Sequence, residues 1–116
     1  MLRKTVSLKE NHAFRRLYAK GKSAVCPTLA LYCRKNGRGV NRLGLTTGVK
    51  LGKAVKRNRV RRRLREIYRL HEEELSSGWD IVAVARVRAV YASYWELERG
   101  FLQLADRLGI REGKKP

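Results

Sequence analysis

Hydrophobic and polar residues alternate between Ser23 and Lys35, which is typical of a β-strand with one face toward a core. The core side is expected to carry Leu29, Leu31 and Cys33, and the other side Ala30, Tyr32 and Arg34. Residues 42–49 alternate in the same way, and the linker 35–41 (KNGRGVN) has the Gly and Asn residues of a hairpin turn. The two strands are therefore expected to form a hairpin.

One side of the second strand has almost no bulk, because it carries Gly44, Thr46 and Gly48. Either another backbone or a crossing helix could approach such a face closely, and the pattern favours neither. The later segment DIVAVA (residues 80–85), which follows Trp79, is apolar on both faces. It is typical of a central strand.

Two segments carry the start signals and the spacing of amphipathic helices. Ser7 and Glu10 have the spacing of a capping box, which predicts a helix from Leu8 to about Lys20 that stops at Gly21. Ser93 and Glu96 predict a second helix that ends at Gly109. Its core stripe is expected to be Leu97, Phe101, Leu104, Ala105 and Leu108.

A third helix is predicted between Lys50 and Arg69, where ten of twenty residues are Lys or Arg and Glu66 is the only acid. At about 100° per residue, Val60, Leu64 and Ile67 form one apolar stripe. Asn58, Arg62, Arg65 and Arg69 lie almost opposite, with Arg61 beside them. We call the four arginines of this set the arginine face: Arg61, Arg62, Arg65 and Arg69. One side of the helix is thus expected to pack on a core while the other faces water or a polyanion, because an unpaired buried cation is costly.

This order of elements predicts an α+β fold, a two-layer sandwich in which helices pack on a mostly antiparallel four-stranded sheet. A chain of 116 residues with 43% hydrophobic residues is expected to form a single domain, 1–116. The ordered core should span about 7–110, with short charged tails at 1–4 and 111–116.

The charge points to the partner. The chain has 28 basic and 10 acidic residues, a net charge of +18 and a pI near 11.0. Repulsion among these like charges opposes the compact state unless a polyanion neutralises them. Nucleic acid is therefore the leading candidate for a partner. Guanidinium donates in a geometry that matches phosphate oxygens, although a merely solvated basic face is the alternative.

No candidate for catalysis by the protein itself emerges. Glu72 to Glu74 are consecutive on a helix end and point apart, so they are not expected to converge on metal ions. His12 and His71 are expected to be packing or solvated histidines, and Cys26 and Cys33, which lack a CxxC spacing, reduced thiols. No bound metal, cofactor or small-molecule substrate is expected.

No apolar run approaches the length of a membrane span, and the N-terminal ten residues lack the apolar segment of a secretory signal. The sequence predicts a cytoplasmic protein without a membrane partner.

The segment LGLTTGVKLGKAVKRNRVRRRLRE (residues 43–66) resembles the bacterial ribonuclease P protein subunit. The likeness extends to FRRLYAKG at 14–21, LALYCR at 29–34 and DIVAVAR at 80–86. It implies a protein that binds a catalytic RNA and the 5′ leader of precursor tRNA, while the RNA, with Mg²⁺, removes the leader. It also implies a left-handed βαβ crossover through the basic helix, against the usual hand.

The same resemblance implies the site residues. Phe14, Tyr18 and Tyr32 would line a leader-binding cleft, and RNA would meet the basic helix and its approach at Lys50, Lys53, Arg57, Asn58, Arg61, Arg62, Arg65 and Arg69. Val49 departs from the family where another Lys is frequent, and Tyr18 departs where Phe is common. Core packing is the alternative role for Phe14 and Tyr18. The rival functions are a ribosomal or general structural RNA-binding protein and a self-sufficient nuclease.

Overall fold

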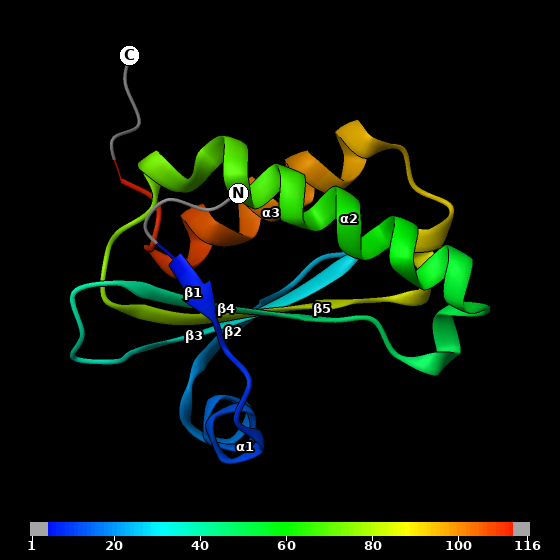
Figure 1. Cartoon of the computed structure of the whole chain (residues 1–116). Coiled ribbons are helices and arrows are strands. Elements are labelled where there is room, and N and C mark those ends of the chain that lie inside the picture. Colours follow the sequence, from blue (N-terminus) through cyan, green and yellow to red (C-terminus); the bar gives the residue numbers. More distant parts are fainter. Residues whose placement is uncertain (1–4, 113–116) are drawn as a thin grey trace.

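The computed structural model describes residues 5–112, which form three helices and a five-stranded sheet (Figure 1). The helices are α1 (Asn11–Lys20), α2 (Ala54–His71) and α3 (Tyr94–Leu108). The strands are β1 (Thr5–Ser7), β2 (Lys22–Val25), β3 (Leu29–Lys35), β4 (Asn41–Thr46) and β5 (Trp79–Ala85). Short 3-10 helices lie at Val49–Leu51, Glu72–Glu74 and Val87–Val90.

The sheet has the order β1-β4-β5-β3-β2, with the apolar β5 at its centre as its sequence predicts. β5 runs parallel to β4 and antiparallel to β3. The expected hairpin between the strands at 23–35 and 42–49 was therefore wrong, because β5 lies between β3 and β4. A strand that is apolar on both faces gains most from the central position, and this gain overrides the local turn signal.

The sheet also has one strand more, and more parallel pairing, than the sequence indicates. β1 pairs parallel with β4, so two of the four strand pairs are parallel and two antiparallel. The segment from Ser23 to Lys35 is split at Pro27 into β2 and β3, and the Cys26 N–H donates to the Leu29 carbonyl at 2.8 Å across the turn. The parallel neighbours β4 and β5 are connected through α2, and the hand of this crossover stays a prediction of the family resemblance.

Helices cover both faces of the sheet: α2 and α3 lie on one side and α1 on the other (Figure 1). The stripe Val60, Leu64 and Ile67 of α2 is buried in the larger core cluster, as predicted. The five expected core positions of α3 are buried in the same cluster. The capping box of Ser93 and Glu96 is present, and Gly109 ends α3 with φ 75°. The helical periods are thus confirmed.

The first helix begins at Asn11 rather than at Leu8, and the expected capping box of Ser7 and Glu10 is not formed. Ser7 is paired with Leu43 in β1, so its backbone is committed to the sheet. The Glu10 carboxylate instead accepts a 3.2 Å bond from Arg42. Gly21 ends the helix as predicted, and its N–H donates to the Leu17 carbonyl.

A largely buried ion pair joins the two central parallel strands. Arg42 on β4 donates to both carboxylate oxygens of Asp80 on β5, at 2.8 and 2.7 Å. Asn36 donates to the same carboxylate at 3.0 Å. Burial raises the pKa of Asp80, but the hydrogen bonds from Arg42 and Asn36 outweigh it and hold that pKa below its usual range. Asp80 therefore stays charged and paired.

His71, at the end of α2, links this helix to α3. Its ring nitrogens lie 2.8 Å from a carboxylate oxygen of Glu74 and 2.8 Å from one of Glu98. Burial lowers the pKa of His71, but the hydrogen bonds to Glu98 and Glu74 outweigh it, so that the pKa is raised. Both bonds are donated only when the ring is protonated.

We expect replacement of His71 by Gln to flatten the pH dependence of stability. Because the pKa is raised on folding, the histidine's contribution is complete below about pH 6.5 and is lost as pH rises through the folded-state pKa. Urea midpoints at about pH 6 and pH 8.5 for both proteins test this. If the urea midpoint changed by the same amount between the two pH values in both proteins, His71 would not be the source of the pH dependence.

Cys26 and Cys33 are free and buried, in line with the expected reduced thiols. Burial raises the pKa of Cys33 to about 11, only partly offset by Lys22, so this thiol is a poor nucleophile. Arg111, which the sequence placed in a loose tail, pairs with Glu74 at 2.8 Å and forms a bridge with Leu75. Glu112, which the sequence placed in the same tail, donates its N–H to the Glu74 carbonyl at 2.6 Å. The remaining tail positions, 1–4 and 113–116, lie outside the described residues.

Candidate nucleic-acid interface

The basic helix α2 is fixed by its apolar side and presents its charges outward. Val60, Leu64, Ile67 and Tyr68 are its buried residues. Gly52, with φ 111°, ends the preceding 3-10 turn, and the extended Lys53 then starts the helix. Lys50 and Lys53 are exposed on this approach. The position of the helix is therefore set by packing, and its cations lie on the outer side.

The arginine face is available to a ligand at two of its four positions without breaking any contact. Arg62 and Arg65 are exposed, and their side chains form no hydrogen bond or ion pair with residues 5–112. Arg61 donates to the Thr47 hydroxyl at 2.7 Å. Asn58 is exposed, whereas Arg57 is only partly so.

Arg69 differs from the other three, because its guanidinium pairs with Glu66 one turn earlier at 2.6 and 3.0 Å. The pair is exposed to water, so it is weak, but a phosphate at Arg69 would have to compete with a carboxylate. Helical spacing alone did not predict that Glu66 pairs with Arg69, although Glu66 is the only acidic residue between Lys50 and Arg69.

The three predicted aromatics gather on the face of the sheet that α1 covers. The ring centroids of Phe14 and Tyr18 are 6.4 Å apart, and those of Tyr18 and Tyr32 are 4.9 Å apart in an edge-to-face contact. Tyr18 is 44% exposed, whereas Phe14 and Tyr32 are partly buried against the small cluster of Leu8, Ala13, Leu17 and Val82.

Gly44 makes room for Phe14. A Cβ atom at Gly44 would lie 2.8 Å from two ring carbons of Phe14, which is closer than van der Waals contact permits. At Gly44 this side of β4 is thus approached by a helix side chain rather than by another backbone, whereas nothing in residues 5–112 beyond the chain neighbours lies within 4 Å of a Cβ at Gly48, so neither alternative holds along the whole side. Phe14 is consequently a packing residue, and it also lines the cavity described next.

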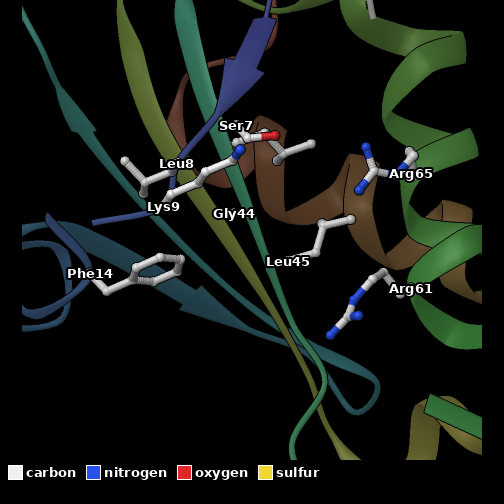
Figure 2. A pocket seen from close by; sticks show the side chains of 9 residues that line it. Ser7, Leu8, Lys9, Phe14, Gly44, Leu45, Arg61 and Arg65 are labelled. Carbon is white, nitrogen blue, oxygen red and sulfur yellow. The ribbon is translucent and has the colours of Figure 1, made fainter. Parts of the chain in front are cut away.

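Two of the arginines and one of the aromatics, Phe14, line a cavity at an open edge of the sheet. β1 pairs with β4 only as far as Leu43, so the next residues of β4 have no strand on that side. Figure 2 shows Phe14 on one side of this edge and Arg61 and Arg65 reaching toward it from α2 on the other. The cavity there measures about 250 Å³ and is lined by Ser7, Leu8, Lys9, Phe14, Leu43, Gly44, Leu45, Arg61 and Arg65.

Sequence reasoning missed the contributions of Ser7, Lys9 and Leu45 to this cleft. They come from the segment around the short β1 strand and from β4, and three strand residues are too few to show an alternating pattern. Of the aromatics, Phe14 alone lines this cavity, while Tyr18 and Tyr32 extend the surface from it across the sheet.

The acidic residues are engaged in structural contacts. Thr5 donates to Glu72 at 2.6 Å, and Glu74 contacts His71 and Arg111, each at 2.8 Å. No group of three or more His, Cys, Asp or Glu that could hold a metal ion occurs within residues 5–112. His12 is exposed at the start of α1.

None of the helices in the described part of the chain has the length and apolar character that crossing a bilayer requires.

Fold and surface together define a class of protein: a small α/β sandwich whose arginine-rich helix and aromatic groove present a polycationic face suited to a sugar-phosphate chain. Comparison with known proteins makes the assignment specific. The family model Ribonuclease P matches residues 2–109. The chain belongs to the ribonuclease P protein family and is accordingly a protein component of this ribonucleoprotein endoribonuclease.

Among curated relatives, the ribonuclease P protein component of Alkaliphilus oremlandii is 43% identical over 103 residues, which are 89% of this chain and 90% of the relative. That of Thermoanaerobacter sp. is 36% identical over 115 residues and covers 99% of both. The solved ribonuclease P protein of Staphylococcus aureus matches with a TM-score of 0.84 at 27% identity, over 91% of this chain and 97% of that one. That of Thermotoga maritima has a TM-score of 0.79 at 30% identity, over 87% and 96%.

Proposed function

We propose that the chain contributes to 5′ maturation of tRNA by binding RNA on two surfaces. The arginine face and the approach at Lys50 and Lys53 bind the catalytic RNA subunit. The cleft beside Phe14, extended by Tyr18 and Tyr32, binds the single-stranded 5′ leader of precursor tRNA. One observation carries the leader site: Arg61 and Arg65 face Phe14 across the open edge of β4, so cations for the leader phosphates and a ring for its bases lie within one cleft. These two arginines border both surfaces, whereas Arg62 and Arg69 lie outside the cleft.

The chemical step is assigned to the RNA subunit with its Mg²⁺ ions. Metal-dependent hydrolysis by the protein would need carboxylates that converge on ions about 3.5–4 Å apart. In residues 5–112 the acidic groups nearest to this requirement, Glu72 and Glu74, are directed to different partners. The protein's part is therefore to hold, orient and neutralise the RNA in the cytoplasm, without a cofactor of its own.

Reconstitution tests this assignment. The purified chain alone should leave precursor tRNA intact and should stimulate cleavage when a ribonuclease P RNA is added at low Mg²⁺. Cleavage by the protein with Mg²⁺ but without the RNA would contradict it. Failure to stimulate would favour a general structural RNA-binding role, the rival that the sequence left open.

Replacement of Tyr18 by Ala tests the leader cleft. We expect it to weaken binding of a single-stranded leader by about 1–3 kcal/mol, the usual worth of one base stacked on an aromatic ring. Tyr18 suits this test better than Phe14, because its ring is substantially exposed whereas that of Phe14 packs on Gly44. The affinity of the holoenzyme for precursor tRNA should fall while its affinity for mature tRNA stays unchanged. Equal losses for both RNAs would place Tyr18 outside the leader path.

A further inference from the structure

A second groove lies on the flank of α2 that faces α3, and the cleft described above does not include it. It measures about 410 Å³ and is lined by Arg62, Arg63, Arg65, Glu66, Arg69 and Tyr94. Arg65 is the one residue that lines both this groove and the leader cleft. A volume above about 300 Å³ is in the range of sites that hold small organic groups.

Tyr94, which is partly exposed, lines this groove from α3, and the neighbouring Trp95 contacts its ring from outside the groove lining. The rings of Tyr94 and Trp95 meet edge to face with centroids 5.2 Å apart. Trp95 is 65% exposed, which is unusual for so large an apolar surface on a helix that buries its opposite stripe. An exposed indole that contacts a tyrosine of an arginine-lined groove is a surface on which a nucleobase can stack.

The pair is held in place by its surroundings rather than by a mobile loop. The capping box of Ser93 and Glu96 fixes the first turn of α3, in which both rings lie. Arg63 of α2 donates to the Ala92 carbonyl at 3.2 Å and so ties this turn to the basic helix. The first turn of α3 is therefore attached to α2, the helix from which the arginines project.

The charge of the groove selects an anion. Four guanidinium groups line it against one carboxylate, and that carboxylate, Glu66, is already paired with Arg69. Arg62 and Arg65 are left without an ion-pair partner within the described chain, on the side where α2 faces solvent. Cations for phosphate and rings for bases recognise single-stranded nucleic acid, and an acidic peptide would leave the rings without a matching group.

We propose that the groove between α2 and α3 is a second nucleotide site, in which an unpaired nucleotide of the ribonuclease P RNA stacks on Trp95 and Tyr94 while Arg62 and Arg65 hold its phosphates. This assignment rests on the proposed function. The RNA subunit is the occupant rather than the leader, because a leader lying in the cleft beside Phe14 would have to cross over α2 to reach Tyr94. Helix α2 then lies between two RNA segments, with Arg65 bordering both.

Paired substitutions separate the two sites. In the full chain, Trp95→Ala should weaken binding to the ribonuclease P RNA by about tenfold. It should leave unchanged the ratio of the holoenzyme's affinities for precursor and mature tRNA. Trp95→Phe should restore most of the lost affinity, since it keeps a ring. Tyr18→Ala should have the opposite effect: it should change the ratio of the affinities for precursor and mature tRNA and leave the affinity for the ribonuclease P RNA unchanged. Equal thermal midpoints for the Trp95 variants and the parent would show that folding is intact.

Fluorescence gives a direct readout of contact. A base stacked on Trp95 should quench the emission of the parent protein as the ribonuclease P RNA is added, and Trp95→Phe, which keeps Trp79, should lose this quenching. If the parent protein does not bind the RNA at all, the proposed function fails and this site with it. If the parent binds but Trp95→Ala binds within twofold of it, the second site alone is overturned. A Trp95→Ala effect on the precursor-to-mature ratio would assign the groove to the leader and would likewise overturn this proposal.

Discussion

Replacing Arg62 and Arg65 together by Ala should make RNA binding both weaker and less dependent on salt. Each phosphate that the protein neutralises releases counterions, so each lost contact lowers the slope of log K against log salt by about 0.7–0.9. Two lost contacts should therefore reduce the slope by roughly 1.5. Both side chains are exposed and unpaired within residues 5–112, so folding should be nearly unaffected. Binding isotherms for the ribonuclease P RNA at several salt concentrations measure the slope.

The matched control removes the same charge from another surface. Arg99→Ala with Arg107→Ala also takes the net charge from +18 to +16, since each variant loses two cations. Both residues are exposed on α3, and neither lines the cleft or the α2–α3 groove. This control should shift affinity only slightly. An equal change of slope in the two double variants would mean that net charge, rather than the arginine face, governs binding.

Replacing Arg42 by Leu should destabilise the fold by about 3–5 kcal/mol, because it leaves the buried Asp80 carboxylate without its charged partner. Arg42 also forms an ion pair with Glu10, which directly precedes α1, the helix that carries Phe14. We therefore expect the leader cleft to loosen along with the sheet. Urea unfolding of both proteins measures the loss of free energy.

Arg38→Leu is the control for that experiment. It removes the same charge from an exposed loop position, where Arg38 makes only the smallest of the contributions that lower the pKa of Asp80, and it should change stability by no more than about 0.5 kcal/mol. If Arg42→Leu unfolded at the same urea concentration as the parent, the ion pair with Asp80 would contribute nothing to the fold. Lowering the pH should reduce the stability of the parent more than that of Arg42→Leu. The pKa of Asp80 is lowered in the folded parent, so the stability that its charged form contributes is lost as pH falls through that pKa.

The features that the sequence predicted correctly are those encoded by local spacing. The buried stripes of α2 and α3 follow the helical period, and the capping box of Ser93 and Glu96 needs only neighbouring residues. β5 was recognised as central because it is apolar on both faces. The family resemblance added Phe14, Tyr18 and Tyr32 as leader-binding residues, although spacing alone favoured a core role for aromatics. Of the three, Phe14 lines the cavity, and the binding of RNA by all three stays a prediction.

The features that it did not predict depend on partners distant in the chain. Ser7 was read as a helix cap because Glu10 follows it, but pairing with β4, more than thirty residues away, draws it into a strand. The order of the strands escaped local reasoning for the same reason, since β5 separates β3 from β4. The pairing of Glu10 with Arg42 is likewise visible only once the sheet has brought α1 and β4 together.

The central claim is that α2 anchors itself by its apolar stripe and offers its exposed arginines to RNA. Labelling with an arginine-specific dicarbonyl reagent, with and without the ribonuclease P RNA, tests it most directly when each site is read by peptide mapping. RNA should protect Arg62 and Arg65 strongly and leave Arg99 on α3 as reactive as in the free protein. Unchanged labelling of Arg62 and Arg65 in a complex that is demonstrably formed would contradict the account.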